Sequence, residues 1–100
     1  MKVEEKLIPT TTIEELAEKY DLTMVITERN VLSNLPKYFA KFKNVELKDG
    51  NILISNFGNG STKKEAIQDY AKEISIKTLV LNAHSEERVE FYTGYVTYDS

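Results

Sequence analysis

Hydrophobic and polar residues recur along this chain at spacings typical of helices in some segments and of strands in others. Residues 12–20 favour a short helix, since Thr12 and Glu15 have the spacing of a capping box. Its apolar residues fall on one face at helical spacing: Ile13, Leu16, Ala17 and Tyr20. The segment 22–28 is rich in Thr, Val and Ile and favours a strand, with Leu22, Met24 and Ile26 on one face.

The stretch 37–42 fits two periodicities. As a strand it places Tyr38, Ala40 and Phe42 inward, whereas as a helix it groups Leu35, Tyr38, Phe39 and Phe42. The aromatic residues and the hairpin that follows favour the strand.

The hairpin is the clearest local signal. Asp49-Gly50 can form a two-residue turn with positive φ, which predicts Leu47 opposite Ile52 and Val45 opposite Ile54. These four side chains would share the buried face of the hairpin.

The second half of the chain predicts one helix and two strands. Gly58-Asn59-Gly60 is expected to break the preceding strand, and Thr62 with Glu65 repeats the capping-box spacing of a helix that begins at residue 61 or 62. Its apolar stripe is Ala66, Ile67, Tyr70, Ala71 and Ile74. Residues 77–83 and 88–98 then favour strands, with Gly94 as a bulge or an end.

These elements predict one α+β domain over residues 1–100, in the order α-β-β-β-α-β-β. Both helices would lie on one face of a largely antiparallel sheet. The chain has 100 residues and no run of apolar residues as long as a signal peptide or a membrane span requires. We therefore expect a soluble, cytoplasmic protein without a membrane partner.

Charge is unevenly distributed. The net charge is −3, but residues 29–48 carry five cations against Glu46 alone, between acidic segments at 1–28 and 84–100. Such a basic segment is either a binding face or a set of charges that pair on folding.

Residues that carry catalytic chemistry are scarce. The chain has no cysteine and one histidine, which excludes thiolate metal sites and histidine-rich ones. His84-Ser85-Glu86 contains the residue types of a catalytic triad, but neighbours in sequence do not converge as a triad must. Gly58–Lys64 lacks the Walker pattern of a nucleotide site. We expect no enzyme activity, no cofactor and no metal.

Two partial resemblances bear on the fold. FGNGSTKKEAIQDYAKEI (57–74) resembles the last strand and second helix of double-stranded RNA-binding domains (dsRBDs), which implies phosphate contacts by Lys63 and Lys64. Residues 37–83 are similar to HicB-type antitoxin domains through Gly60-Ser61-Thr62 and Glu65-Ala66. Both imply a dsRBD-like or HicB-like core.

A third resemblance bears on function. Residues 35–83 resemble small proteins of phages and prophages of Gram-positive bacteria, through an aromatic strand, a Gly-x-Gly-x-Thr helix start and KTLV-x-NA. It implies a phage protein that binds a host or phage protein stoichiometrically, for example as an inhibitor of a host enzyme or of a defence system such as a CRISPR effector. The alternative is a module that binds duplex RNA or DNA.

The expected partner-binding residues come from two groups of side chains. The aromatic residues of the C-terminal segment are expected to form a contact surface, which would also serve a homodimer. Together with exposed lysines, the set is Lys37, Lys41, Lys43, Lys63, Lys64, Tyr92, Tyr95 and Tyr98.

Overall fold

The computed structural model describes residues 1–30, 32 and 34–99, and over these residues the fold is α+β, as the sequence predicts. The strands are β1 (Thr10–Thr12), β2 (Met24–Glu28), β3 (Tyr38–Phe42), β4 (Val45–Asp49), β5 (Ile52–Ile54), β6 (Gly58–Gly60), β7 (Thr78–Leu81), β8 (Val89–Tyr92) and β9 (Tyr95–Thr97). The helices are α1 (Ile13–Tyr20) and α2 (Lys63–Glu73). No helix in this described part of the chain is long and apolar enough to cross a membrane.

The strands form three sheets, where the sequence predicted one. Their orders are β1-β9, β2-β3-β6 and β5-β4-β7-β8, and every pairing is antiparallel except the parallel β1–β9 pair. The expected order α-β-β-β-α-β-β counted three strands between the helices, whereas the structure has five in the described residues. One extra strand arises at Asn44, whose φ of 60° turns the chain sharply after β3, so that β3 and β4 enter different sheets. The other is β6.

Both predicted helix caps are confirmed. The Thr12 hydroxyl oxygen accepts from the Glu15 N–H at 3.1 Å, and the Thr62 hydroxyl oxygen accepts from the Glu65 N–H at 3.1 Å. Each bond satisfies an N–H that the first helical turn leaves unpaired.

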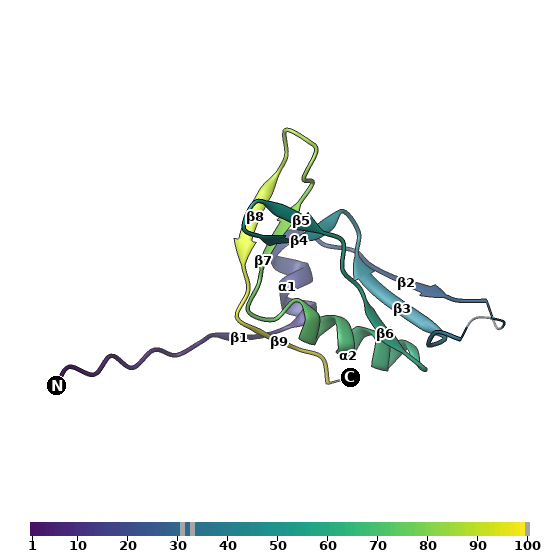
Figure 1. The fold of residues 1–100 in the computed structure, drawn as a ribbon, viewed down its shortest axis with the longest axis horizontal. Helices are drawn as coiled ribbons and strands as arrows, with labels where there is room; N and C mark the ends of the chain where they lie inside the picture. Colours follow the sequence, from purple (N-terminus) through teal and green to yellow (C-terminus); the bar gives the residue numbers. More distant parts are fainter. Residues whose placement is uncertain (31, 33, 100) are drawn as a thin grey trace.

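The expectation that Gly58-Asn59-Gly60 breaks a strand is wrong, because these residues are β6 and pair with β3. A Cβ on Gly58 would lie 2.1 Å from the Tyr70 backbone nitrogen, and one on Gly60 would lie 2.3 Å from that of Ala66. The glycines are therefore needed for close packing of α2 on β6, and they do not end the strand. Figure 1 shows α2 beside β6 and β3.

The hairpin exists, but each paired residue of β4 lies opposite a residue two positions further along the chain than predicted. Leu47 lies opposite Ile54 and Asp49 opposite Ile52, so the two turn residues are Gly50 and Asn51. Gly50 has a φ of 61°, and this register puts the positive φ on glycine, whereas the predicted turn also required it of Asp49.

One core joins the two larger sheets and both helices. Phe42 of β3 meets Tyr70 of α2 edge to face at 5.5 Å between ring centroids, and Tyr20 of α1 stacks on Phe91 of β8 at 3.8 Å. Of the predicted stripe, Ala66, Tyr70, Ala71 and Ile74 are buried, and Ile67 is partly buried against the core. Residues 1–9 are exposed and extend away from this body (Figure 1).

Candidate functional site

The five lysines that the sequence nominates are divided among three places. Lys37 directly precedes β3, and Lys41 lies on it. Lys43 follows β3 at its other end. Lys63 and Lys64 are the first residues of α2, which follows β6 directly. Because Gly60 at the end of β6 pairs with Tyr38 at the start of β3, these two lysines lie near the Lys37 end of β3. The lysines therefore do not form one patch.

Two of these lysines are already engaged. Lys37 forms an ion pair with Glu28 at 3.5 Å, and the nearby Tyr38 oxygen and then Glu28 raise the pKa of Lys37. The Lys41 ammonium donates to the Ser55 hydroxyl at 3.1 Å. Both side chains still reach solvent.

The three tyrosines differ in exposure. Tyr92 is 62% exposed and Tyr95 is 48% exposed. Tyr98 is half-buried against the core, and its backbone carbonyl accepts from the Gln68 amide at 3.2 Å. Tyr92 and Tyr95 can therefore meet a partner over a large ring area, whereas Tyr98 mainly covers α2.

Tyr92 stands between two clefts of similar size. One, of about 340 Å³, is lined by Pro9, Leu16 and Tyr20 among others, and the second, of about 350 Å³, by Leu47, Ile54 and Ile76 among others. Tyr92 lines both. We call Tyr92 and the two clefts beside it the Tyr92 surface.

Apolar groups at the Tyr92 surface reach solvent. Ile54 is 43% exposed and Ile76 is 37% exposed. Tyr92 ends β8, an edge strand that pairs with β7 on one side and with no described strand on the other. Such an edge offers backbone groups to an incoming chain.

Ile76 also has an unusual backbone. Its φ of 55° is a left-handed conformation that a β-branched residue rarely adopts and that costs about 1–2 kcal/mol. The Ile76 N–H donates to the Gly94 carbonyl at 2.9 Å, and the buried Thr93 hydroxyl donates to the Ile74 carbonyl at 2.6 Å. The turn that carries Ile76 is thus fixed to the residues that follow Tyr92.

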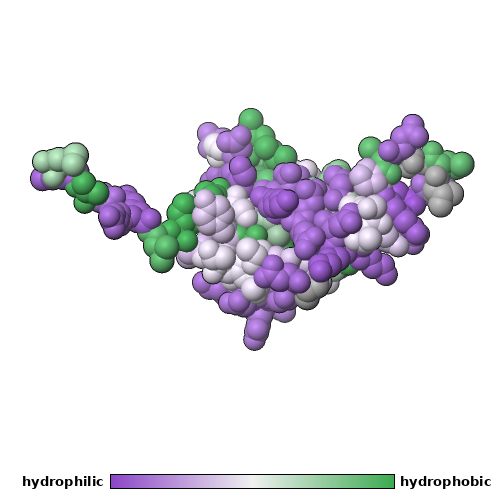
Figure 2. Space-filling view, turned by 90° about the horizontal axis from the view of Figure 1, so that it is seen from below, coloured by the Kyte–Doolittle hydropathy of each residue, from purple (hydrophilic) through white to green (hydrophobic). Residues whose placement is uncertain are grey.

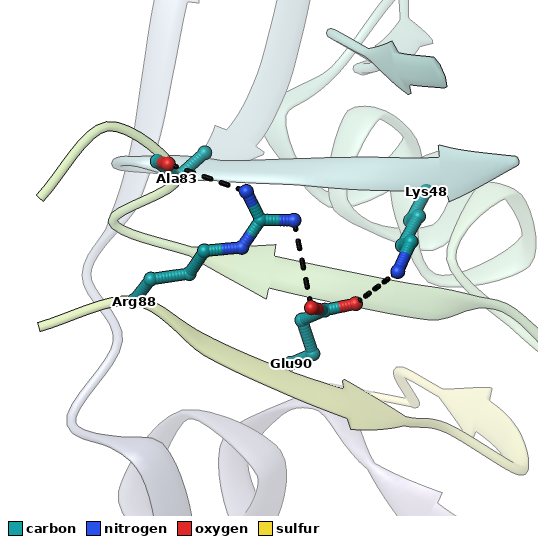
Figure 3. Close-up of polar contacts among 4 residues, drawn as sticks. All are labelled: Lys48, Ala83, Arg88 and Glu90. Atoms are coloured by element: carbon teal, nitrogen blue, oxygen red, sulfur yellow. Dashed lines mark hydrogen bonds and ion pairs between the residues drawn. The ribbon is translucent and has the colours of Figure 1, made fainter. Parts of the chain in front are cut away.

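Charged side chains cover the sheet next to the Tyr92 surface. Lys48 and Arg88 converge on Glu90 at 2.6 and 3.5 Å, and Arg88 also donates to the Ala83 carbonyl at 3.4 Å (Figure 3). The hydrogen bond from Lys48 lowers the pKa of Glu90, with smaller contributions from both positive charges. Lys48 and Arg88 therefore share the single negative charge of Glu90, and the cluster gives Tyr92 a polar border.

His84 is exposed in the connection between β7 and β8. Across the residues that the structure describes, no group of three His, Asp or Glu side chains could hold a metal ion.

The face seen from below, over α2, is largely hydrophilic (Figure 2).

Sequence reasoning missed Ile54 and Ile76. Alternation assigned Ile54 to the buried side of the hairpin, but β5 is an edge strand, which leaves that side chain half-covered. The position of Ile76 depends on a positive φ at a residue type that gives no such signal.

No protein-family model, curated protein or solved structure matches this chain.

Proposed function

We propose that the protein is a non-enzymatic binding module whose partner is another protein, held in a fixed stoichiometry at the Tyr92 surface. The observation that supports this most is the position of Tyr92, 62% exposed on an edge strand between two clefts whose walls combine apolar and charged side chains. Tyrosine is enriched among residues that dominate interface energies, since it combines a large apolar ring with a polar tip.

The backbone of Ile76 supports the same surface. A strained residue persists only where the surrounding structure imposes it, and strain of this kind clusters at binding sites. Here it keeps Ile76 partly exposed at a cleft wall that it shares with Ile54 and Tyr92.

The class of partner that we propose rests on the resemblance to phage proteins. We propose a host enzyme or defence system, such as a CRISPR effector, engaged in the cytoplasm of the infected bacterium. A dsRBD-like or HicB-like core belongs to the same proposal, and it is supported by β6 followed by the capped helix α2.

Affinity capture from a Gram-positive bacterial lysate tests the proposal with a matched pair of variants. Tyr92→Thr removes the ring and keeps a strand-forming residue, and Val25→Thr makes a similar exchange at a 40% exposed position on β2. We expect the wild type and Val25→Thr to retain one protein in a constant ratio. Tyr92→Thr should lose it by about thirtyfold, as expected for a dominant interface residue.

Two results would contradict the proposal. One is capture of the same protein by Tyr92→Thr at wild-type yield. The other is captured material that disappears after nuclease treatment. That second result would favour duplex binding through Lys63 and Lys64. In that case the double variant Lys63→Glu, Lys64→Glu would lose the affinity for the duplex and the salt dependence of that affinity.

A further inference from the structure

A second surface lies on the opposite side of the β2-β3-β6 sheet from α2. Ala40 and Gly58 face α2, so the alternate residues of the paired strands point away from it. On β2 and β3 these outward residues are Val25, Thr27, Phe39 and Lys41. We call this the outer face of the sheet.

Aromatic rings and a guanidinium group lie together on the outer face. The Phe39 and Phe57 ring centroids are 5.3 Å apart, at an interplanar angle of 58°. The Arg29 guanidinium carbon lies 4.6 Å from the Phe39 centroid and 5.8 Å from that of Phe57. Phe57 is 39% exposed, so part of this apolar surface reaches solvent.

Three hydrogen bonds fix the plane of Arg29. The guanidinium donates to the Pro36 carbonyl at 2.8 Å, to the Tyr38 carbonyl at 3.5 Å and to the Asn59 side-chain oxygen at 2.7 Å. A planar cation held in this way is pre-organised for stacking, because little side-chain freedom is left to lose. The Asn59 amide N–H₂ group remains a donor at the edge of the same cluster.

The charge of the outer face selects the ligand. Arg29 and Lys41 are cations on this face, and the outward residues of β2 and β3 include no acid. At the rim of the outer face, the only ion pair among the described residues joins Glu28 to Lys37. Aromatic rings next to cations are the combination that binds single-stranded nucleic acid, because bases stack on the rings and phosphates meet the cations.

We propose that the outer face binds single-stranded nucleic acid. One base stacks against Phe57 and Arg29, Asn59 donates to the edge of that base, and Lys41 contacts a backbone phosphate. This site is separate from the Tyr92 surface and lies on the face of the sheet opposite α2, so it does not depend on the proposed protein partner.

Fluorescence anisotropy with labelled 12-nucleotide oligo(U) and oligo(dT), and with a duplex of the same length, tests this proposal. We expect at least one of the two single strands to bind more tightly than the duplex. The difference in affinity between oligo(U) and oligo(dT) then shows whether the site prefers RNA or DNA. Phe57→Leu keeps an apolar side chain without the aromatic ring, and we expect it to weaken binding about tenfold or more. The slope of log K against log salt should stay as in the wild type, because no phosphate contact is lost.

Lys41→Gln should change the slope instead. Loss of one phosphate contact reduces the slope by about 0.7 for a single strand. Lys63→Gln with Lys64→Gln is the matched control on α2, and Tyr92→Thr is the control for the protein-binding surface; both should bind single strands as the wild type does. Thermal melting of each variant shows that the fold is retained.

The proposal is overturned if neither single strand binds at low salt. It is also overturned if folded Phe57→Leu binds within twofold of the wild type, or if the α2 double variant loses the binding. Those results leave the proposed protein partner intact, because its test uses Tyr92→Thr and nuclease treatment and does not involve Phe57 or Lys41.

Discussion

Gly58→Ala tests how closely α2 packs on β6. The added Cβ would lie 2.1 Å from the Tyr70 backbone nitrogen and 2.3 Å from the Ala66 carbonyl oxygen. Non-bonded heavy atoms prefer about 3.5–4.0 Å, so α2 has to move away by more than about 1 Å. Both obstructing atoms belong to helix backbone and cannot rotate out of the way.

The cost is that of an overpacked core, about 1–3 kcal/mol, together with looser contacts around Tyr70, which is 1% exposed. The lower entropy of alanine in the unfolded chain returns about 0.4–1 kcal/mol. Because the obstructing atoms are helix backbone, we take the upper end of that cost and expect Gly58→Ala to lower the free energy of unfolding by about 2 kcal/mol. For a chain of this length that corresponds to a fall in Tm of about 8–16 °C.

Urea and thermal unfolding, followed by circular dichroism, measure the effect. Gly50→Ala is the control, since Gly50 has a φ of 61° but no atom within 4 Å of an added Cβ. It should lose only about 1 kcal/mol, because the same entropic gain offsets part of the cost of the left-handed backbone. Equal stability of the two variants would refute the reasoning, because α2 would then not be seated on the β6 backbone.

Two further predictions concern the buried face of α2. Ile74→Ala, at a residue with no exposed surface, should lower the free energy of unfolding by about 2–4 kcal/mol through lost burial and a cavity, and a value near zero in urea unfolding would place Ile74 on the surface. Burial raises the pKa of Tyr70 to about 12, and the hydrogen bond with the Phe42 backbone opposes this with a smaller effect. The unfolded state therefore releases the Tyr70 proton at a lower pH than the folded state does. Stability consequently falls as pH rises from about 10 towards 12. Absorbance titration should show a late tyrosine that Tyr70→Phe removes, and loss of the late step in any other variant instead would contradict the assignment.

Local signals in the sequence were sufficient for the helices and for β3. The capping residues Thr12 and Thr62 bond as their spacing predicts, and Ala40 and Phe42 are buried as the alternation predicts. These features depend on neighbours within a few residues, which the sequence displays directly.

Features that depend on distant contacts were missed. Gly58-Asn59-Gly60 has the composition of a turn, and only the approach of α2 explains why glycine occupies a strand. The exposure of Ile54 and Ile76 depends on which strands lie at sheet edges, and the short strand β1 exists only because β9 pairs with it. Of the nominated contact residues, Tyr92 came from its aromatic character, whereas its two clefts are formed by segments far apart in sequence.

The parallel β1–β9 pair has a consequence for the order of folding. Thr10 pairs with Tyr95, and Thr12 with Thr97, so about 85 residues of chain separate the partners. Closing a loop of that length costs entropy that three-residue strands repay poorly on their own. We infer that this pair forms after the core and opens before it, as a small cooperative unit of low stability. Pro9 and Thr11 line one cleft of the Tyr92 surface, and the Pro9 carbonyl accepts from the Tyr95 N–H at 2.9 Å. Opening of the pair would therefore reshape that cleft without unfolding the domain.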